Sequence, residues 1–334
     1  MTDWHQFIAS QTTTSNATGV SGKGFFSALT DLGLMACSGD DAANFLHNQL
    51  TNDVEHLTLD EARLAGYCTP KGRLLASFLM WRSADSVMLE VSRDIQATVQ
   101  KRLQMFVMRA KAKITDATDA FVILGLGGAA VAPVLAQWFP VVPAVPFGKV
   151  DTDAGTLVRV ADAAGVPRYQ WITSPAIALS AWPALDAGLE FASPEAWRLS
   201  EITAAIPHIT LPTQEKFVPQ MINFEAIGGV NFKKGCYPGQ EIVARSQYLG
   251  KLKRRMLPAS VSAAEAVAGM EVYADKDAEQ PCGMIVNAAR DHDGVYHCLI
   301  EIKTAALDGD NIRLGLNGAV LHFSALPYAL PDTV

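Results

Sequence analysis

The stretch from residue 217 to residue 255 decides the interpretation of this chain and reads FVPQMINFEAIGGVNFKKGCYPGQEIVARSQYLGKLKRR. Its centre is KGCYPGQE, residues 234–241. Two glycines and a proline so close together are typical of a tight turn. The sequence therefore predicts a turn that carries the thiol of Cys236 at its corner.

Local residue types predict the elements on both sides of this turn. Residues 230–232 are expected to form a short strand. Gly235 permits a positive φ angle, which would bring the thiol to the tip of the turn. Pro238 is acceptable in the first turn of a helix, and residues 240–245 can continue that helix. The thiol is thus expected beside a helix N-terminus.

The surroundings predicted for Cys236 favour the thiolate over the thiol. Lys233 and Lys234 supply positive charge, and a helix N-terminus adds unpaired N–H groups and the positive end of its dipole. A reactive cysteine is one interpretation. A buried structural cysteine is the other, because free cysteine is among the most buried residue types. Composition alone leaves the two interpretations even.

The string KKGCYPGQEIVAR, residues 233–245, is similar to the signature of the YgfZ family of folate-binding proteins. Their fold resembles that of the glycine-cleavage T-protein, an aminomethyltransferase with a related K-x-D-F-I-G-x-E segment. A cysteine in place of that aspartate indicates the YgfZ branch. The resemblance implies that Cys236 is the functional thiol, and it leaves open whether the thiol acts as a ligand, a redox group or a nucleophile. It assigns Lys234 to the same site, with the motif residues Gly235, Tyr237, Gly239, Gln240, Glu241 and Arg245.

Two upstream segments resemble the same families. Residues 38–54, SGDDAANFLHNQLTNDV, match a G-x-D-A-x-x-F-L-x-x-Q-x-T-x-D-V pattern and predict a helix that serine and aspartates cap. We expect His47 on this helix to be a surface or interface residue rather than a base, since no partner carboxylate is visible close by. The second match is the predicted hairpin CTPKGR at 68–73. In the strand after it, Ala76 and Ser77 stand where the T-protein has an essential aspartate near the folate.

The resemblance also implies a folate site, with tetrahydrofolate or a derivative as cofactor. Trp197 lies in a helix predicted to begin at Ser193-Pro194, and it matches a folate-contacting tryptophan of the YgfZ family. An indole can stack on a flat pterin ring, although ordinary core packing is the alternative. A second folate contact of the family falls at Leu32, which is aliphatic here. Thr203 stands where the T-protein has a pterin-binding glutamate, and Glu201 is the nearest other carboxylate.

Length and composition limit the number of domains and the class of protein. A chain of 334 residues suggests two or three domains, and 49% hydrophobic with 18% charged residues is typical of a soluble globular protein. The net charge of −7 argues against a surface coated with positive charge for nucleic-acid binding. The N-terminus lacks the features of a signal peptide, which predicts a cytoplasmic protein without a membrane partner.

The densest cationic run is either a solvated loop or a site for a folate polyglutamate tail or an RNA phosphate. It comprises Lys233, Lys234, Arg245, Lys251, Lys253, Arg254 and Arg255.

Two other patterns carry less weight. Residues 121–130, FVILGLGGAA, contain a G-x-G-x-x-A that superficially fits a dinucleotide fingerprint, but Pro133 follows early in the expected helix. The five cysteines are scattered and form no C-x-x-C, so neither a disulfide framework nor a zinc site is indicated. We predict no metal site from these patterns.

We expect an α+β, T-protein-like multidomain fold. Its parts would be an N-terminal α+β domain (1–116), a middle α+β domain (117–246) that can intercalate with the first, and a C-terminal β-barrel (247–334). The expected function is tetrahydrofolate binding in support of iron–sulfur cluster assembly or repair, and thereby of tRNA modification. Partners would be iron–sulfur enzymes or assembly factors, including tRNA-modifying enzymes, with direct RNA binding left open. The alternatives are a folate-dependent aminomethyl or methyl transferase, which the missing carboxylate disfavours, and a nonenzymatic scaffold.

Overall fold

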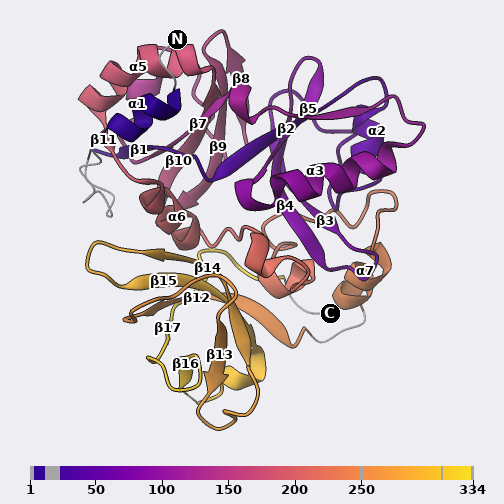
Figure 1. The fold of residues 1–334 in the computed structure, drawn as a ribbon, viewed down its shortest axis with the longest axis vertical. Helices are drawn as coiled ribbons and strands as arrows, with labels where there is room; N and C mark the ends of the chain where they lie inside the picture. Colours follow the sequence, from indigo (N-terminus) through magenta and orange to yellow (C-terminus); the bar gives the residue numbers. More distant parts are fainter. Residues whose placement is uncertain (1–3, 12–22, 249–251, 310, 332–334) are drawn as a thin grey trace.

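The structure is a computed structural model that describes residues 4–11, 23–248, 252–309 and 311–331. Three β-sheets lie at the corners of a triangle, two above and the C-terminal one below (Figure 1). The mixture of helices with largely antiparallel sheets confirms the α+β class. Within the described ranges, no helix combines the length and the apolar character needed to cross a bilayer.

The first sheet has five strands in the order β3-β4-β5-β2-β6, all paired antiparallel. Its strands are buried almost throughout, because helix α3 covers one side and the segment around Phe217 and Phe224 joins the same core. The Phe217 carbonyl accepts a hydrogen bond from the Leu74 amide, which ties that segment to β4. The elements are β2 (Leu32–Ser38), α2 (Ala42–His47), β3 (Ala62–Cys68), β4 (Leu74–Arg82), β5 (Ser86–Ser92), α3 (Arg93–Val107), β6 (Lys113–Asp116) and the 3-10 helix η1 (Thr118–Ala120).

The second sheet has six strands in the order β11-β1-β7-β10-β9-β8. Strand β1 is parallel to β11 and antiparallel to β7. An aromatic cluster packs on this second sheet, and in it Trp182 of α5 makes edge contacts with Trp4, Phe26 and Phe191. The elements are α1 (Trp4–Ser10), β1 (Phe25–Ala28), β7 (Val122–Gly127), α4 (Val131–Leu135), β8 (Lys149–Thr152), β9 (Gly155–Ala163), β10 (Val166–Thr173), α5 (Pro175–Gly188) and β11 (Glu190–Phe191).

The chain passes between these two sheets more than once. Strand β1 belongs to the second sheet, although it precedes every strand of the first sheet in the sequence. The N-terminal residues are therefore interwoven with the middle part of the chain. A division into domains near residues 116 and 246 remains a proposal.

The C-terminal sheet also has six strands, in the order β16-β13-β14-β15-β12-β17, with antiparallel pairs throughout. It curls around a small core of its own that includes Val272, Ile285 and Ile300, as a half-barrel with β16 and β17 at its edges. The elements are β12 (Arg254–Val261), β13 (Glu271–Ala274), β14 (Gly283–Arg290), β15 (Tyr296–Lys303), the 3-10 helix η4 (Thr304–Leu307), β16 (Ile312–Leu314) and β17 (His322–Phe323).

The segment that connects the sheets holds the helices of the candidate site. Helix α6 follows Ser193 with Pro194 as its first residue, as the sequence predicted. Residues 230–232, however, lie in a loop and not in a strand, because the amide of Asn231 donates to the carbonyl of Thr51, which lies outside the strands. The elements are α6 (Pro194–Thr203), the 3-10 helices η2 (Leu211–Thr213) and η3 (Pro219–Ile222), and α7 (Gln240–Tyr248).

The glycine-rich strand β7 does not belong to a dinucleotide fold. It is antiparallel to both of its neighbours, β1 and β10. A dinucleotide fingerprint needs parallel strands with a helix crossing between them. Gly125 serves packing instead, because a side-chain carbon there would lie only 2.5 Å from the indole of Trp197.

Candidate functional site

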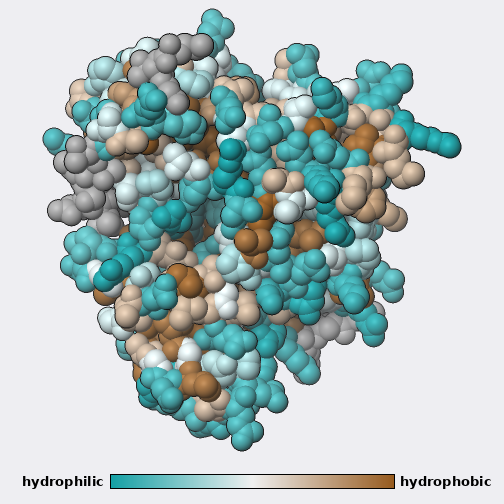
Figure 2. Space-filling view, viewed as in Figure 1, coloured by the Kyte–Doolittle hydropathy of each residue, from teal (hydrophilic) through white to brown (hydrophobic). Residues whose placement is uncertain are grey.

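A cavity of about 720 Å³ opens where α6 faces the start of β2, the start of α3 and the C-terminal sheet. Trp197 and Leu32, the two residues predicted to contact folate, both line it. Asn287 and Tyr296 contribute from β14 and β15, so the first sheet, α6 and the C-terminal sheet all shape the space. The face in Figure 2 is largely hydrophilic, with hydrophobic side chains in small separate groups.

Trp197 is held in place from two sides. The missing side chain of Gly125 lets the indole lie directly on β7. The guanidinium carbon of Arg168 lies 4.9 Å from the ring centroid, within cation–π range. Only 3% of Trp197 is exposed, so the residue belongs to the core while it also lines the cavity. A rigid aromatic wall of this kind can receive a flat ring without further ordering.

Glu201, one helical turn after Trp197, supplies a buried carboxylate to the same cavity. Its Oε1 accepts a hydrogen bond of 2.9 Å from Arg168, and Oε2 lies 3.5 Å from Nε2 of His208. Burial alone would raise the pKa of Glu201, but Arg168 and His208 outweigh it and lower this pKa to about 2. The same pairing raises the pKa of His208 although burial opposes it. Thr203 is exposed on the helix, and the carboxylates that α6 presents to the cavity are Glu195 and the buried Glu201.

A second buried carboxylate, Glu90, was missed by the sequence analysis. It lies on β5, 3% exposed, and its Oε1 accepts a hydrogen bond of 3.1 Å from Gln170. Burial raises the pKa of Glu90 to about 7, against the opposing effect of the Gln170 hydrogen bond. Glu90 lines a void of about 20 Å³ together with Arg168, Glu201 and His208. One acidic residue in the apolar strand SVMLEVS was the only sequence indication.

Ala76 and Ser77 are both buried in β4. The Ser77 hydroxyl accepts a hydrogen bond of 2.9 Å from the amide of Ile209. These positions therefore serve packing and backbone pairing, and the carboxylate of this region comes from Glu90 on the neighbouring strand.

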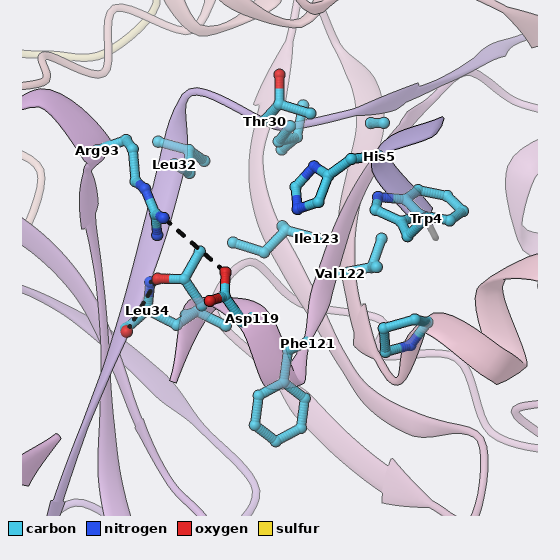
Figure 3. Close-up of a pocket in the computed structure, with 14 residues that line it drawn as sticks. Trp4, His5, Thr30, Leu32, Leu34, Arg93, Asp119, Phe121, Val122 and Ile123 are labelled. Atoms are coloured by element: carbon cyan, nitrogen blue, oxygen red, sulfur yellow. Dashed lines mark hydrogen bonds and ion pairs between the residues drawn. The ribbon is translucent and has the colours of Figure 1, made fainter. Parts of the chain in front are cut away.

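A second cavity, of about 520 Å³, adjoins the first and shares Leu32 and Arg93 with it. Figure 3 shows Arg93 and Asp119 on one side, with nitrogen and oxygen 4.0 Å apart, and Trp4 and His5 on the other. Leu32 thus lies where the two cavities meet. Neither Trp197 nor Glu201 lines the second cavity, so the candidate site is centred on the first.

The cysteine motif lies elsewhere, beside α2 and the β3–β4 hairpin (Figure 1). Its residues are all described, and none of them lines the larger cavity. Cys236 is exposed, whereas Cys37, Cys68, Cys282 and Cys298 are buried. The buried-cysteine interpretation of Cys236 is therefore wrong.

Lys234 anchors the motif. Its ammonium group is buried and donates hydrogen bonds to the carbonyls of His47 and Leu50 at the end of α2. It also lies 4.9 Å from the ring centroid of Tyr237. Burial lowers the pKa of Lys234 to about 8, against the opposing charges of Asp53, Cys236 and Glu55. Lys234 thus joins the loop to α2 and is less available as a free charge beside the thiol than the sequence suggested.

The backbone of the motif also differs from the prediction. The positive φ angle of +83° belongs to Gly239 and not to Gly235. A side chain at Gly239 would lie 2.4 Å from the carbonyl of Thr69, so glycine is required where the loop meets the hairpin. Helix α7 begins at Gln240, beyond the predicted Pro238, so Cys236 precedes the helix by a short loop. Tyr237 is buried and Gln240 half-buried, while Glu241 and Arg245 are exposed on α7.

His47 corrects a further expectation. It was predicted to be a surface or interface residue rather than a base, without a partner carboxylate, but only 7% of it is exposed, and its Nδ1 lies 3.1 Å from Oδ1 of Asp53. The chain turns back directly after α2, which brings Asp53 against the helix that carries His47. Sequence spacing did not reveal this turn.

The cationic run does not form one free patch. Arg255 is buried and paired with Glu225, and Arg254 makes two hydrogen bonds of 2.8 Å with the Glu301 carboxylate. Lys251 lies outside the described residues. Within the described part of the chain, no group of three or more histidine, cysteine or acidic side chains is arranged to hold a metal ion.

Comparisons with known proteins agree with this architecture. No family model matches the chain. A protein of Escherichia fergusonii named tRNA-modifying protein YgfZ is 27% identical over 307 residues, covering 91% of this chain and 93% of that protein. A protein of the same name from Escherichia coli is 28% identical with the same coverage. The crystal structure of the glycine cleavage system aminomethyltransferase T from Bartonella henselae superimposes with a TM-score of 0.71 at 15% identity, covering 96% of this chain and 92% of that one. The chain is thus a homologue of the proteins named tRNA-modifying protein YgfZ, with the fold of the glycine-cleavage T-protein.

Proposed function

We propose that this protein binds a reduced folate in the larger cavity and supports tRNA modification through iron–sulfur enzymes, with Cys236 as its functional thiol. The observation that carries the folate part is that Trp197 and Glu201 line one cavity together with Leu32. The names of the homologous proteins support the tRNA-modification part.

The cavity suits the chemistry of a pterin. Trp197 offers a flat apolar surface, and an aromatic contact adds about 0.5–1.5 kcal/mol beyond the area buried. A pterin ring carries N–H donors on one edge, and the Glu201 carboxylate, ionised because its pKa lies near 2, can accept them. Arg168 and His208 hold that carboxylate in place before any ligand arrives.

The thiol is proposed to act apart from the folate. Cys236 is exposed, whereas the proposed pterin contacts are buried in a cavity that the cysteine motif does not line. An exposed thiol on an anchored loop can meet a protein partner, and iron–sulfur enzymes or their assembly factors are the partners we propose. We further propose that the protein works in the cytoplasm.

A folate-dependent aminomethyltransferase is the second candidate, and Glu90 is the observation in its favour. A carboxylate could handle a proton of the folate, a contribution typically worth about 10²–10⁴ in rate. Glu90, however, is hydrogen-bonded to Gln170 and does not line the larger cavity. We therefore expect no turnover of an aminomethyl-lipoyl donor at T-protein-like rates.

Anaerobic calorimetry with tetrahydrofolate tests the folate site. Trp197→Phe should weaken binding at least several-fold, because the indole face is lost while an aromatic core residue is kept. Trp182→Phe is the matched control, since Trp182 is also a buried tryptophan but belongs to the aromatic cluster of the second sheet and does not line the larger cavity. Absence of binding by the parent protein, or equal affinity in both variants, would reject this site.

A further inference from the structure

His47 combines three properties that the motif alone does not explain. Its ring is buried at the end of α2, and Nδ1 is engaged by Asp53 at 3.1 Å. Its other nitrogen, Nε2, has no hydrogen-bond partner among the residues that the structure describes. A side-chain carbon at Gly235 would lie 3.5 Å from Nε2, so this edge of the ring faces the residue immediately before Cys236.

The Asp53 carboxylate fixes which nitrogen of the His47 ring carries the proton. When Nδ1–H donates to Asp53, Nε2 carries the lone pair and can accept a proton. Asp53 is itself held by His56, whose backbone amide and ring Nδ1 lie 3.1 and 2.8 Å from its oxygens. These hydrogen bonds lower the pKa of Asp53 although burial opposes them, so the carboxylate stays ionised beside the imidazole.

We infer that His47, oriented by Asp53, accepts the proton of the Cys236 thiol. Consecutive Cα atoms are about 3.8 Å apart, so the exposed Cys236 directly follows the residue that Nε2 faces. The proton leaves Sγ, the S–H electron pair stays on sulfur, and Nε2 gains the proton, which gives a thiolate and an imidazolium. This assignment rests on the proposed role of Cys236 and adds the group that activates it.

The charged groups nearest the His47 ring are mostly acidic. Asp53 lies at hydrogen-bonding distance, and a carboxylate oxygen of Glu55 lies 4.0 Å from Nδ1. Lys234 opposes this with its positive charge, but its ammonium group is directed at the carbonyls of His47 and Leu50. Two carboxylates therefore face the ring against one lysine from the loop.

The test is the rate of alkylation of Cys236 by iodoacetamide against pH, read by mass spectrometry on the full-length native protein. The other four cysteines are buried, which isolates the signal. In His47→Gln the half-maximal rate should move upward by about one pH unit or more, and the rate at pH 7 should fall several-fold, because less thiolate is present. His292→Gln is the matched control: this histidine also lies close to an aspartate, Asp293, but it is exposed in the turn between β14 and β15, and its profile should stay close to that of the parent.

A profile in His47→Gln that superimposes on that of the parent protein would overturn the assignment. If His47→Gln fails to fold, the conservative variant Cys236→Ser provides the second measurement. Loss of the thiol should change the NMR chemical shifts of the His47 ring nitrogens, because Nε2 loses its proton donor, and unchanged shifts would equally reject the pair. Both readouts are independent of folate and of iron–sulfur enzymes, so failure of the proposed function and failure of this inference remain distinguishable.

Discussion

The larger cavity and the cysteine loop differ in the burial and contacts of their key side chains. In the cavity, Trp197 and Glu201 are buried and already engaged, the first by Gly125 and Arg168 and the second by Arg168 and His208. In the loop, Cys236 is exposed, while Lys234 before it and Gly239 after it contact α2 and the β3–β4 hairpin. If the proposed function holds, recognition of a small rigid ligand is built into the core, whereas a group that meets a partner is carried at the edge of the fold.

The two regions should therefore respond differently to substitution. Changes in the cavity remove packing or leave buried charges without partners, and both are costly. Changes at the exposed thiol should alter chemistry and leave the fold intact. Four predictions examine this contrast, in order of decreasing effect.

The largest effect is expected for Trp197→Ala. Removal of a buried tryptophan costs about 3–5 kcal/mol of unfolding free energy through lost burial and the cavity left behind. Urea denaturation measures this loss. A loss of less than 1 kcal/mol would mean that the indole is a replaceable lining group and not part of the core.

The two buried carboxylates should show opposite pH dependence. The pKa of Glu201, about 2, lies below its ordinary 4.5, so its stabilising effect is present above pH 4.5 and is lost as the pH falls toward 2. The pKa of Glu90, about 7, is raised, so stability is lost as the pH rises from 4.5 through 7. Each shift corresponds to roughly 3 kcal/mol at full titration.

Glu90→Gln isolates that second effect. The variant should be more stable than the parent protein at pH 8 and close to it at pH 4, as followed by urea denaturation at both values. Glu201→Gln instead leaves Arg168 without its carboxylate and should be destabilised most clearly near neutral pH. Equal pH profiles for the two variants would contradict the contrast between the carboxylates.

An intermediate effect is expected for Lys234→Met. The carbonyls of His47 and Leu50 lose their buried donor, which costs about 1–3 kcal/mol of unfolding free energy. Lys233→Met is the control, because Lys233 is exposed and its side chain should contribute within about 0.5 kcal/mol. Folate affinity should be unchanged in both. If both lysines prove equivalent, Lys234 does not anchor the loop.

The smallest effect on stability is expected for Cys236→Ser, within about 0.5 kcal/mol. The functional effect should be large, since serine lacks the nucleophilicity and soft-metal affinity of a thiolate. The measurement is the activity of an iron–sulfur tRNA-modifying enzyme in cells that lack the gene and carry the variant. Full restoration by the serine variant would show that the motif is only a structural turn.

The fold was expected from the resemblance, and local patterns predicted single elements within it. The serine and proline at the start of α6 marked that helix, and the resemblance led to Trp197 and Leu32, which the structure brings to one cavity. The positions of Glu90 and His47 were not predictable, because their burial depends on neighbouring segments. Glu90 becomes a partner of Gln170 only when the first two sheets meet.

The wrong prediction of the backbone conformation in the cysteine motif has a similar origin. A positive φ angle was assigned to Gly235 because this glycine precedes the thiol, yet the close contact with the β3–β4 hairpin falls at Gly239. Local sequence shows where glycine permits a turn. It does not show which of two nearby glycines a distant hairpin will approach.

Anaerobic calorimetric titration with tetrahydrofolate, on the parent protein, Glu201→Gln and Cys236→Ser side by side, tests the central claim most directly. We predict that the parent and the serine variant bind with equal affinity, and that Glu201→Gln binds about tenfold or more weakly, because a charged acceptor on the pterin edge is lost. Circular dichroism of each variant checks that the fold is retained. No binding by the parent protein, or unaltered affinity in a folded Glu201→Gln variant, would contradict the assignment of the cavity to folate.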